Sequence, residues 1–200
     1  MSRILILFAH PRFENSLVHQ QLVHAARKVV GVTFHDLYQR YPDFDVDINQ
    51  EQALLLSHDI IVLQHPFYWY SCPPLLKQWL DLVLEHGWAY GREGRSLAGK
   101  KMFNAISTGG SMEAYQPGGF NRFTIGQFLA PFDQTARLCN MEYYPPFVMH
   151  GTHRATARDI ENAGENYRTL LEGLVAGKFS ETEISNVTYL NGLINLNHGS

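Results

Sequence analysis

The sequence predicts a three-layer α/β domain in which helices cover both faces of a doubly wound parallel sheet of five strands. Two observations support this fold class. Short apolar runs alternate along the chain with segments in which apolar residues recur at helical spacing. The 200 residues are 45% hydrophobic, which is enough to build the core of one ordinary domain. We expect residues 1–178 to form this domain and residues 179–200 to form a C-terminal arm.

The first half of the chain supplies three of the strands. Its predicted elements are a strand at residues 4–9, a helix at 17–27, a strand at 32–37, a short helix at 51–57, a strand at 60–63 and a helix from Pro74. Ser16 is the expected N-cap of the first helix, and the pair Pro73 and Pro74 suits a helix start. Residues 38–47 are expected to form an irregular surface loop, because their alternating aspartates lack the glycine and final glutamate of a calcium-binding loop.

The second half supplies two strands and a closing helix. Its predicted elements are a long surface loop at residues 85–95, a strand at 101–108, a helix at 120–138, a strand within 141–149 and an amphipathic helix at 155–176. Pro131 should kink or divide its helix, and Pro145 and Pro146 interrupt the last strand. The tail at 179–200 is too apolar to be free and too short for a domain, so we expect an arm packed on a neighbouring subunit.

Charge and cysteine content argue against several classes of protein. The formal charge of −3 comes from 16 basic and 19 acidic residues without long runs of either sign, which does not favour a nucleic-acid partner. There is no signal peptide and no apolar stretch near the length of a membrane span, so we expect a cytoplasmic protein. Cys72 and Cys139 lack metal-ligand or redox-pair spacing, so we expect reduced thiols and no metal site.

The loop after the first strand has the features of a phosphate site. A helix N-terminus offers unpaired backbone N–H groups and the positive end of the helix dipole. His10, Arg12 and the hydroxyl of Ser16 lie just before such a terminus. No glycine-rich fingerprint accompanies them, so the alternative is a capped surface helix with incidental polar residues.

Four consecutive aromatic residues, Phe67, Tyr68, Trp69 and Tyr70, follow the third strand and Pro66. They fall in a loop at the carboxyl end of a parallel-type strand, which is where ligands bind in open α/β sheets. The alternative is that they belong to the core, but a loop has no inner face that could bury all four. The run therefore predicts a surface for a flat, conjugated ligand.

The fourth strand ends at Thr108 and is followed by Gly109, Gly110 and, further on, Tyr115. Paired glycines after a strand let a ligand approach backbone N–H groups, although a plain glycine turn would have the same sequence. In the flavodoxin-like strand order all three loops should converge on one edge of the sheet. A phosphate loop, an aromatic surface and a loop for the polar edge of a ring together describe a site for flavin mononucleotide (FMN).

Several segments carry a resemblance to a known family. They are Ala9-His-Pro with Ser16, Gln64-His-Pro-Phe-Tyr-Trp-Tyr-Ser-Cys-Pro-Pro-Leu-Leu-Lys-Gln-Trp, Gly87-Trp-Ala-Tyr90 and Ser107-Thr-Gly-Gly with Tyr115. These segments resemble the NAD(P)H quinone oxidoreductases of the DT-diaphorase type. Within that family the chain is most similar to the ancillary subunits of glutathione-gated potassium efflux, through His35-Asp-Leu-Tyr, Tyr41-Pro-Asp-Phe-Asp-Val-Asp-Ile with Glu51-Gln, and Pro145-Pro-Phe with His150. The similarity covers about residues 3 to 175.

The resemblance implies how a flavin would be held. His10, Ser16 and Leu17 match the loop that binds the flavin phosphate. Residues 66–70 match the segment whose backbone meets N5 and O4 of the isoalloxazine ring, and residues 108–110 match the loop at N1 and O2.

The resemblance also implies the reactive residues. Tyr115 matches a tyrosine that supports charge on the reduced flavin. Tyr90 matches a tyrosine that relatives extend into the partner subunit's active site, which implies a homodimer, and Tyr90 and Trp69 would line the substrate pocket. Two positions depart from the family. Relatives with FAD carry asparagine where this chain has Val18, which favours FMN over FAD, and the histidine that works with the catalytic tyrosine is replaced by Asn121.

Three functional hypotheses follow. The leading one is a homodimeric FMN enzyme that takes hydride from NADH or NADPH and passes two electrons to a quinone. The second is a regulatory subunit of a potassium efflux channel, which would reach the inner membrane through that protein and without direct lipid insertion. Residues 179–200 and the loop at 91–95 would then be candidate contacts. The third, a flavodoxin-like electron carrier, is disfavoured because the chain lacks a glycine-rich phosphate loop and a markedly acidic surface.

Overall fold

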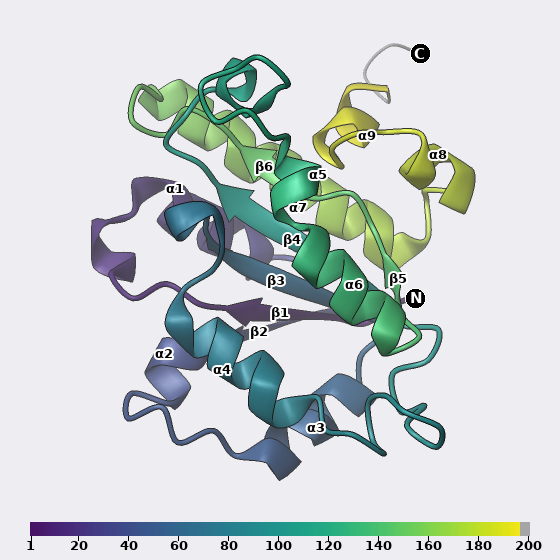
Figure 1. The fold of residues 1–200 in the computed structure, drawn as a ribbon. Coiled ribbons are helices and arrows are strands. Elements are labelled where there is room, and N and C mark those ends of the chain that lie inside the picture. The colour runs from purple at the N-terminus through teal and green to yellow at the C-terminus, as the bar shows by residue number, and fades with distance from the viewer. Residues whose placement is uncertain (197–200) are drawn as a thin grey trace.

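A computed structural model describes residues 1–196, and a twisted parallel sheet forms its middle layer (Figure 1). The strands are β1 (Ile4–Phe8), β2 (Val32–Asp36), β3 (Ile60–Pro66), β4 (Lys101–Ser107), β5 (Glu142–Tyr143) and β6 (Phe147–Met149). Their order is β2-β1-β3-β4-β5, and β6 also pairs with β4. Because β5 and β6 are two halves of one edge strand, interrupted at Pro145 and Pro146, the predicted flavodoxin-like order is confirmed.

The register of the central strands aligns their carboxyl ends. Phe8 of β1 lies opposite Gln64 of β3, and Pro66 of β3 lies opposite Ser107 of β4. The side chains of β1 and β3 are buried on both faces, as expected for a parallel sheet covered by helices on each side. Loops that leave β1, β3 and β4 therefore start from the same edge.

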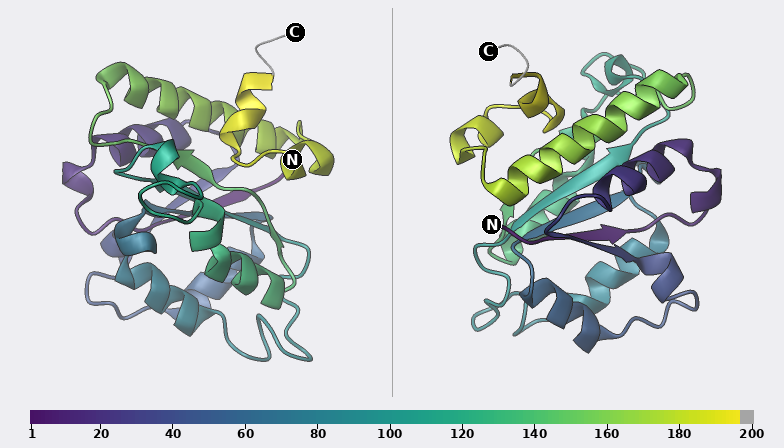
Figure 2. Two further views of the ribbon diagram at one scale, coloured as in Figure 1. Left: turned by 45° about the horizontal axis from the view of Figure 1, so that its top comes forward. Right: turned by 180° about the vertical axis from the view of Figure 1, so that it is seen from behind.

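Helices form the outer layers, as Figures 1 and 2 show from three sides. The layer on one face contains α1 (Leu17–Ala26), α7 (Ala157–Ala176), α8 (Glu181–Ser185) and α9 (Asn191–Leu196). The layer on the other face contains α2 (Leu37–Arg40), α3 (Ile48–Leu56), α4 (Pro74–Val83), α5 (Ile125–Phe128) and α6 (Ala130–Leu138). None of the helices within residues 1–196 is both long and apolar enough to cross a membrane.

Two predicted segments differ from the structure. Residues Leu37–Arg40 form the short helix α2 instead of an irregular loop, because the side chain of Asp36 accepts a hydrogen bond from the backbone of Gln39 at 3.2 Å and caps the turn. The helix predicted at 120–138 begins only at Ile125 and is divided at Leu129. Pro131 lies in the first turn of α6, where a missing N–H costs nothing, so its predicted effect is confirmed.

The C-terminal tail packs on its own chain. Ile184, Leu190 and Leu193 are buried in the core beneath α7. The backbone of Leu190 donates to the carbonyl of Pro146 at 3.0 Å. These contacts account for the apolar residues of the tail, so the predicted arm on a neighbouring subunit is corrected for residues 179–196; residues 197–200 lie outside the described part.

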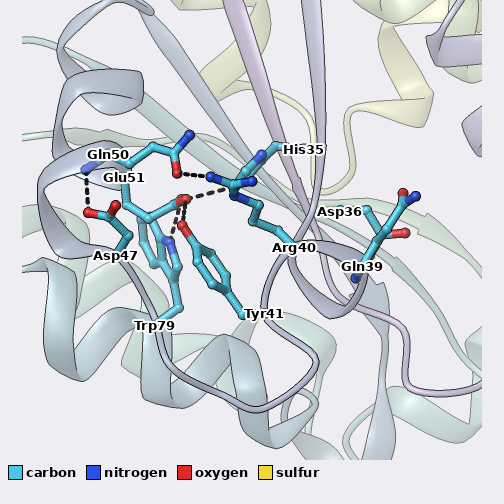
Figure 3. Close-up of polar contacts among 9 residues, drawn as sticks. All are labelled: His35, Asp36, Gln39, Arg40, Tyr41, Asp47, Gln50, Glu51 and Trp79. Atoms are coloured by element: carbon cyan, nitrogen blue, oxygen red, sulfur yellow. Dashed lines mark hydrogen bonds and ion pairs between the residues drawn. The ribbon is translucent and has the colours of Figure 1, made fainter.

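A buried carboxylate joins β2, α3 and α4 (Figure 3). Glu51 is fully buried and accepts hydrogen bonds from Nε2 of His35 at 2.8 Å, the hydroxyl of Tyr41 at 2.5 Å and Nε1 of Trp79 at 2.8 Å. Burial alone would raise the pKa of Glu51, but these donors outweigh burial and hold its pKa below the usual value. The network thus gives a structural role to His35, Tyr41 and Glu51, which belong to segments that carry the family resemblance.

We expect Glu51→Ala to lower the free energy of unfolding by about 3 to 5 kcal/mol, because it leaves two buried donors, Tyr41 and Trp79, and the partly buried His35 without an acceptor. Urea denaturation at pH 7 measures the change, and the exposed Glu161→Ala on α7 serves as the control. Because the folded-state pKa of Glu51 is lowered, its contribution is complete above the ordinary glutamate pKa of about 4.3 and is lost as the pH falls below that value. Equal acid sensitivity of Glu51→Gln and the unmodified protein would contradict this assignment.

Candidate functional site

The three predicted loops meet at the carboxyl edge of the sheet. The backbone of Ala9 donates to the carbonyl of Gln64 at 3.0 Å, and that of Phe67 donates to Ser107 at 2.9 Å, which continues the strand pairing into the loops. The rings of His10 and Tyr68 then stand 6.0 Å apart. The predicted convergence of these loops is confirmed.

One cavity, of about 430 Å³, lies at the N-terminus of α1. Its lining residues are His10, Arg12, Asn15, Ser16, Leu17, Val18, Pro66, Tyr68, Ser107, Thr152, His153, Ala155 and Ile160. The hydroxyl of Ser16 accepts from the backbone of His19 at 3.3 Å, so Ser16 is the N-cap that the sequence predicts. The N–H groups of Leu17 and Val18 stand in the first turn of α1, where no intrahelical acceptor exists, and are therefore available to an anion.

His10 offers a further donor to this cavity. Its side chain is buried, and Nδ1 accepts a hydrogen bond from the backbone of Arg12 at 3.1 Å. Burial lowers the pKa of His10, although Glu14 acts in the opposite direction. In the neutral ring the proton must therefore lie on Nε2, which makes this nitrogen a donor.

His19 is a component that the sequence reasoning missed. It is fully buried on α1, and its Nε2 lies 3.0 Å from the hydroxyl of Ser107 on β4. Its Nδ1 has no partner among the described residues. Burial and the nearby His10 and His65 lower its pKa well below the usual value. The signal that could have found it is its position one helical turn after Ser16, which directs it toward the loop edge.

The aromatic loop presents most of its rings to solvent. Trp69 is 92% exposed and Phe67 only 9%, while Tyr68 and Tyr70 are partly exposed. Trp69 and Tyr70 have positive φ angles of 49° and 63°, a conformation that bulky residues rarely adopt and that is characteristic of functional loops. The alternative of four core aromatics is therefore wrong for all but Phe67.

A second cavity, of about 400 Å³, opens beside this loop. Its lining residues are Phe67, Trp69, Tyr70, Gly109, Gly110, Ala114, Tyr115, Phe120 and Asn121. Side chains pack closely on the glycine pair: a Cβ on Gly110 would lie 3.1 Å from the ring of Tyr115, and one on Gly109 would lie 2.3 Å from the ring of His153 and would displace it. The lack of a side chain at both positions therefore leaves room for the neighbouring rings and also exposes the backbone.

Tyr115 is a buried residue that lines the second cavity. Its ring is buried and meets Phe67 edge-on at 5.9 Å. Burial, followed by the nearby Tyr70, raises the pKa of Tyr115, so the phenol keeps its proton at neutral pH and can donate a hydrogen bond. Asn121 accepts from the hydroxyl of Tyr70 at 3.3 Å, whereas the imidazole that packs on Tyr115 is that of His150 at 5.9 Å. His150 entered the sequence reasoning only as a mark of resemblance.

Tyr90 lies away from both cavities. It lines a third hollow of about 420 Å³, together with residues of α4 and α6 and with Cys72 and Cys139. Neither cysteine forms a disulfide, and burial raises the pKa of both thiols. Any role of Tyr90 in the site therefore requires a second subunit.

Comparisons with known proteins agree with this geometry. A family model described as flavodoxin-like fold matches residues 2–171. The chain is 43% identical over 179 residues to the glutathione-regulated potassium-efflux system ancillary protein KefG of Cronobacter sakazakii, covering 89% of this chain and 97% of that protein. Among solved structures, general stress protein 14 of Treponema denticola in complex with FMN is 41% identical with a TM-score of 0.82, covering 86% of this chain and 99% of that one.

A second solved structure is a protein of P. pentosaceus named NADPH-quinone reductase. It is 34% identical with a TM-score of 0.76, and the match covers 84% of this chain and 96% of that one. Because the family model spans most of the chain, the protein belongs to the flavodoxin-like fold family, as its resemblance to the NAD(P)H quinone oxidoreductases predicts.

Proposed function

We propose that the protein is a flavin-dependent NAD(P)H:quinone oxidoreductase that uses FMN. The observation that carries the proposal is the pair of cavities on either side of the loop at 66–70, one at a helix N-terminus and one walled by aromatic rings and Tyr115. The relative solved with FMN and the relative named NADPH-quinone reductase support the same cofactor and reaction.

The first cavity fits the phosphate of FMN. A dianion there would receive the N–H groups of Leu17 and Val18, the Nε2 proton of His10 and the positive end of the α1 dipole, with Arg12 at the rim. The isoalloxazine ring would then lie along residues 66–70, with its polar pyrimidine edge at residues 108–110. FAD remains the alternative cofactor, but the phosphate contacts do not require an adenylate.

The second cavity fits the reacting ends of NAD(P)H and quinone, one after the other. The chemistry that FMN supplies when bound is acceptance of hydride and transfer of two electrons to a quinone. Tyr115 would direct its phenol proton at the negative charge that develops there. Trp69 would form a wall of the substrate pocket, and Asn121 would assist by holding the hydroxyl of Tyr70.

We further propose a homodimer in which Tyr90 completes the site of the partner. Trp69 and Phe120 are both more than 90% exposed at the rim of the second cavity, which leaves two large apolar side chains uncovered in one chain. A second subunit would cover them and exclude water from the reacting groups.

A second candidate function is that of an ancillary subunit of a potassium efflux channel, with residence at the inner membrane through that protein. The observation that favours it is the identity to KefG across nearly the whole of both chains. The tail is no longer a candidate contact, because its apolar residues pack on their own chain. The loop at 91–95, with Arg92 and Arg95 exposed, remains one.

We expect the double substitution His10→Ala and Ser16→Ala to lower FMN affinity by about 1 to 3 kcal/mol, the usual cost of losing hydrogen bonds to a charged group. Fluorescence titration of flavin-free protein measures the change, and chromatography of the cofactor released from purified protein distinguishes FMN from FAD. Unchanged affinity would place the phosphate elsewhere. A colourless protein that takes up neither flavin would refute the proposed function as a whole.

We expect Tyr115→Phe to slow flavin reduction by NADPH about tenfold or more while flavin content stays the same, because a hydrogen-bond donor to developing charge is removed. Stopped-flow absorbance measures the rate. Tyr144→Phe is a matched control, since the hydroxyl of Tyr144 bonds to Glu181, away from both cavities. Equal rates for Tyr115→Phe and the unmodified protein would remove Tyr115 from the catalytic residues.

For the second candidate function, we expect Arg92→Glu with Arg95→Glu to weaken co-purification with the cytoplasmic part of a potassium efflux channel at least severalfold, because the charge of the contact is reversed. Flavin content and quinone reduction should not change. Arg158→Glu with Arg168→Glu, at two exposed positions on α7, controls for net charge. Equal retention of both variants would exclude this loop from the interface.

A further inference from the structure

We infer that the C-terminal segment, residues 179–196, positions the active-site loop at 108–110 through a contact of Tyr189 with His150. The inference rests on the proposed function, because it assigns a positioning role in that site. It goes beyond the family likeness, since the family model ends at residue 171 and leaves this segment unmatched.

His150 is held between two tyrosine rings. It follows β6 directly, and its ring centroid lies 5.9 Å from that of Tyr115 and 5.4 Å from that of Tyr189, the latter in an edge-on arrangement. Tyr115 belongs to the second cavity, and Tyr189 belongs to the connection between α8 and α9. The tail therefore reaches the residue directly behind the proposed reactive tyrosine.

A ring nitrogen of His150 connects it to the loop at 108–110. Nδ1 lies 3.1 Å from the hydroxyl of Thr108, and that hydroxyl donates to the carbonyl of Gly110 at 2.9 Å. Because Thr108 gives its proton to Gly110, Nδ1 of His150 must be the donor in the other bond, and Nε2 carries a lone pair. Nε2 is buried without a partner among the described residues.

The environment keeps this imidazole neutral. Burial lowers the pKa of His150 to about 4, and Glu113 opposes burial only in part. The other groups that face it are the phenols of Tyr115 and Tyr189, whose pKa values are raised by burial, and the uncharged hydroxyl of Thr108. At neutral pH the single proton on Nδ1 is thus committed to Thr108.

The tail fixes Tyr189 by binding the edge of β6. The side chain of Asn191 accepts from the backbone N–H of Val148 at 2.9 Å and donates to its carbonyl at 3.1 Å, so it replaces a strand neighbour. Leu190, which lies between Tyr189 and Asn191 in the chain, is fully buried, and its backbone donates to the carbonyl of Pro146. Tyr189 is therefore placed by a segment anchored on its C-terminal side.

Residues 149–152, at the end of β6, also hold the loop at 108–110 by backbone hydrogen bonds. Thr108 donates to the carbonyl of Met149 at 2.9 Å and accepts from Thr152 at 3.0 Å, and the backbone of Gly151 donates to Gly110 at 2.8 Å. Without the ring of Tyr189, His150 could turn away from Thr108 and admit water to Nε2. The loop at 108–110 would lose its side-chain tether beside Tyr115, while the phosphate cavity at α1 would be unchanged. Tyr189 is thus a positioning residue that does not touch substrate.

The test uses the full-length chain with Tyr189→Leu, which removes the ring, and Tyr189→Phe, which keeps it. In flavin-free protein, the pH titration of the His150 imidazole by NMR, assigned with His150→Gln, should move from about 4 toward the ordinary value of about 6.5 in Tyr189→Leu only. In flavin-loaded protein, reduction by NADPH should slow about tenfold in Tyr189→Leu and return to the unmodified rate in Tyr189→Phe. FMN affinity should be the same in all three proteins.

Ile184→Ala is the matched control, because Ile184 is buried in the same tail but belongs to α8 and to the core beneath α7. It should lower Tm without moving the His150 titration or the reduction rate. If it slows reduction as much as Tyr189→Leu does, the effect is general loosening and the inference is wrong. An unchanged titration and rate in Tyr189→Leu would also overturn it.

A variant that does not fold and a protein that binds no flavin can both be told apart from failure of the inference. If Tyr189→Leu does not fold, Tyr189→Met offers a longer, flexible side chain without the ring that can adapt to the space, and it gives the same readouts. If the unmodified protein binds no flavin, the proposed function fails, but the NMR titration of flavin-free protein still decides whether Tyr189 holds His150.

Discussion

The site depends on one constraint, the backbone register of β1, β3 and β4. This register brings the three strand ends to the same height, and the hydrogen bonds from Ala9 to Gln64 and from Phe67 to Ser107 carry it one residue into the loops. A slip of one residue would turn every side chain of a strand to the opposite face of the sheet. His19 could then no longer reach Ser107 across the sheet, and the helix N-terminus would not face the aromatic loop. The chemistry is therefore built on main-chain pairing that buried apolar side chains keep in place.

Much of the fold could be predicted because its signals are local. Apolar runs mark strands that are buried on both faces, Ser16 caps a helix by its own hydroxyl, and the pair Pro73 and Pro74 marks a helix start. Features set by distant contacts could not be predicted. The tail has a polar, irregular sequence, and only its fit against β6 and α7 shows where its few apolar residues go. The short helix at Leu37–Arg40 was missed for a different, local reason: it depends on a single capping aspartate, which is a weak signal within an acidic stretch.

The candidate site divides in the same way. Residues proposed to contact the flavin through backbone or loop position have a signal in the sequence, since a strand end followed by aromatic residues or glycines is visible in a linear pattern. The placement of His150 beside Tyr115 has no such signal, because it depends on contacts between distant segments. Asn121, which stands where the family has a histidine, lines the second cavity, and the imidazole that packs on Tyr115 is that of His150, which follows β6 and lies 35 residues further along the chain than Tyr115. His35, Tyr41 and Glu51 are the opposite case. They carry the family resemblance and could suggest chemistry, but in the structure they form a hydrogen-bond network around a buried carboxylate.

Four buried imidazoles around the site share one electrostatic property. Burial lowers the pKa of His10, His19, His65 and His150, so these four rings are neutral at physiological pH. His65 shows how such a ring is held: Nδ1 lies 3.0 Å from the carbonyl of Pro66, and Nε2 lies 2.9 Å from the amide nitrogen of Asn104. These contacts require the proton on Nδ1 and leave Nε2 as an acceptor. Because the unfolded chain binds protons near the ordinary histidine pKa of about 6.5, each buried ring makes the folded state less stable as the pH falls below that value. In the proposed site, the anionic cofactor would therefore meet helix N–H groups, the neutral Nε2 donor of His10 and Arg12 at the rim, and its binding should depend on geometry more than on the protonation of His10.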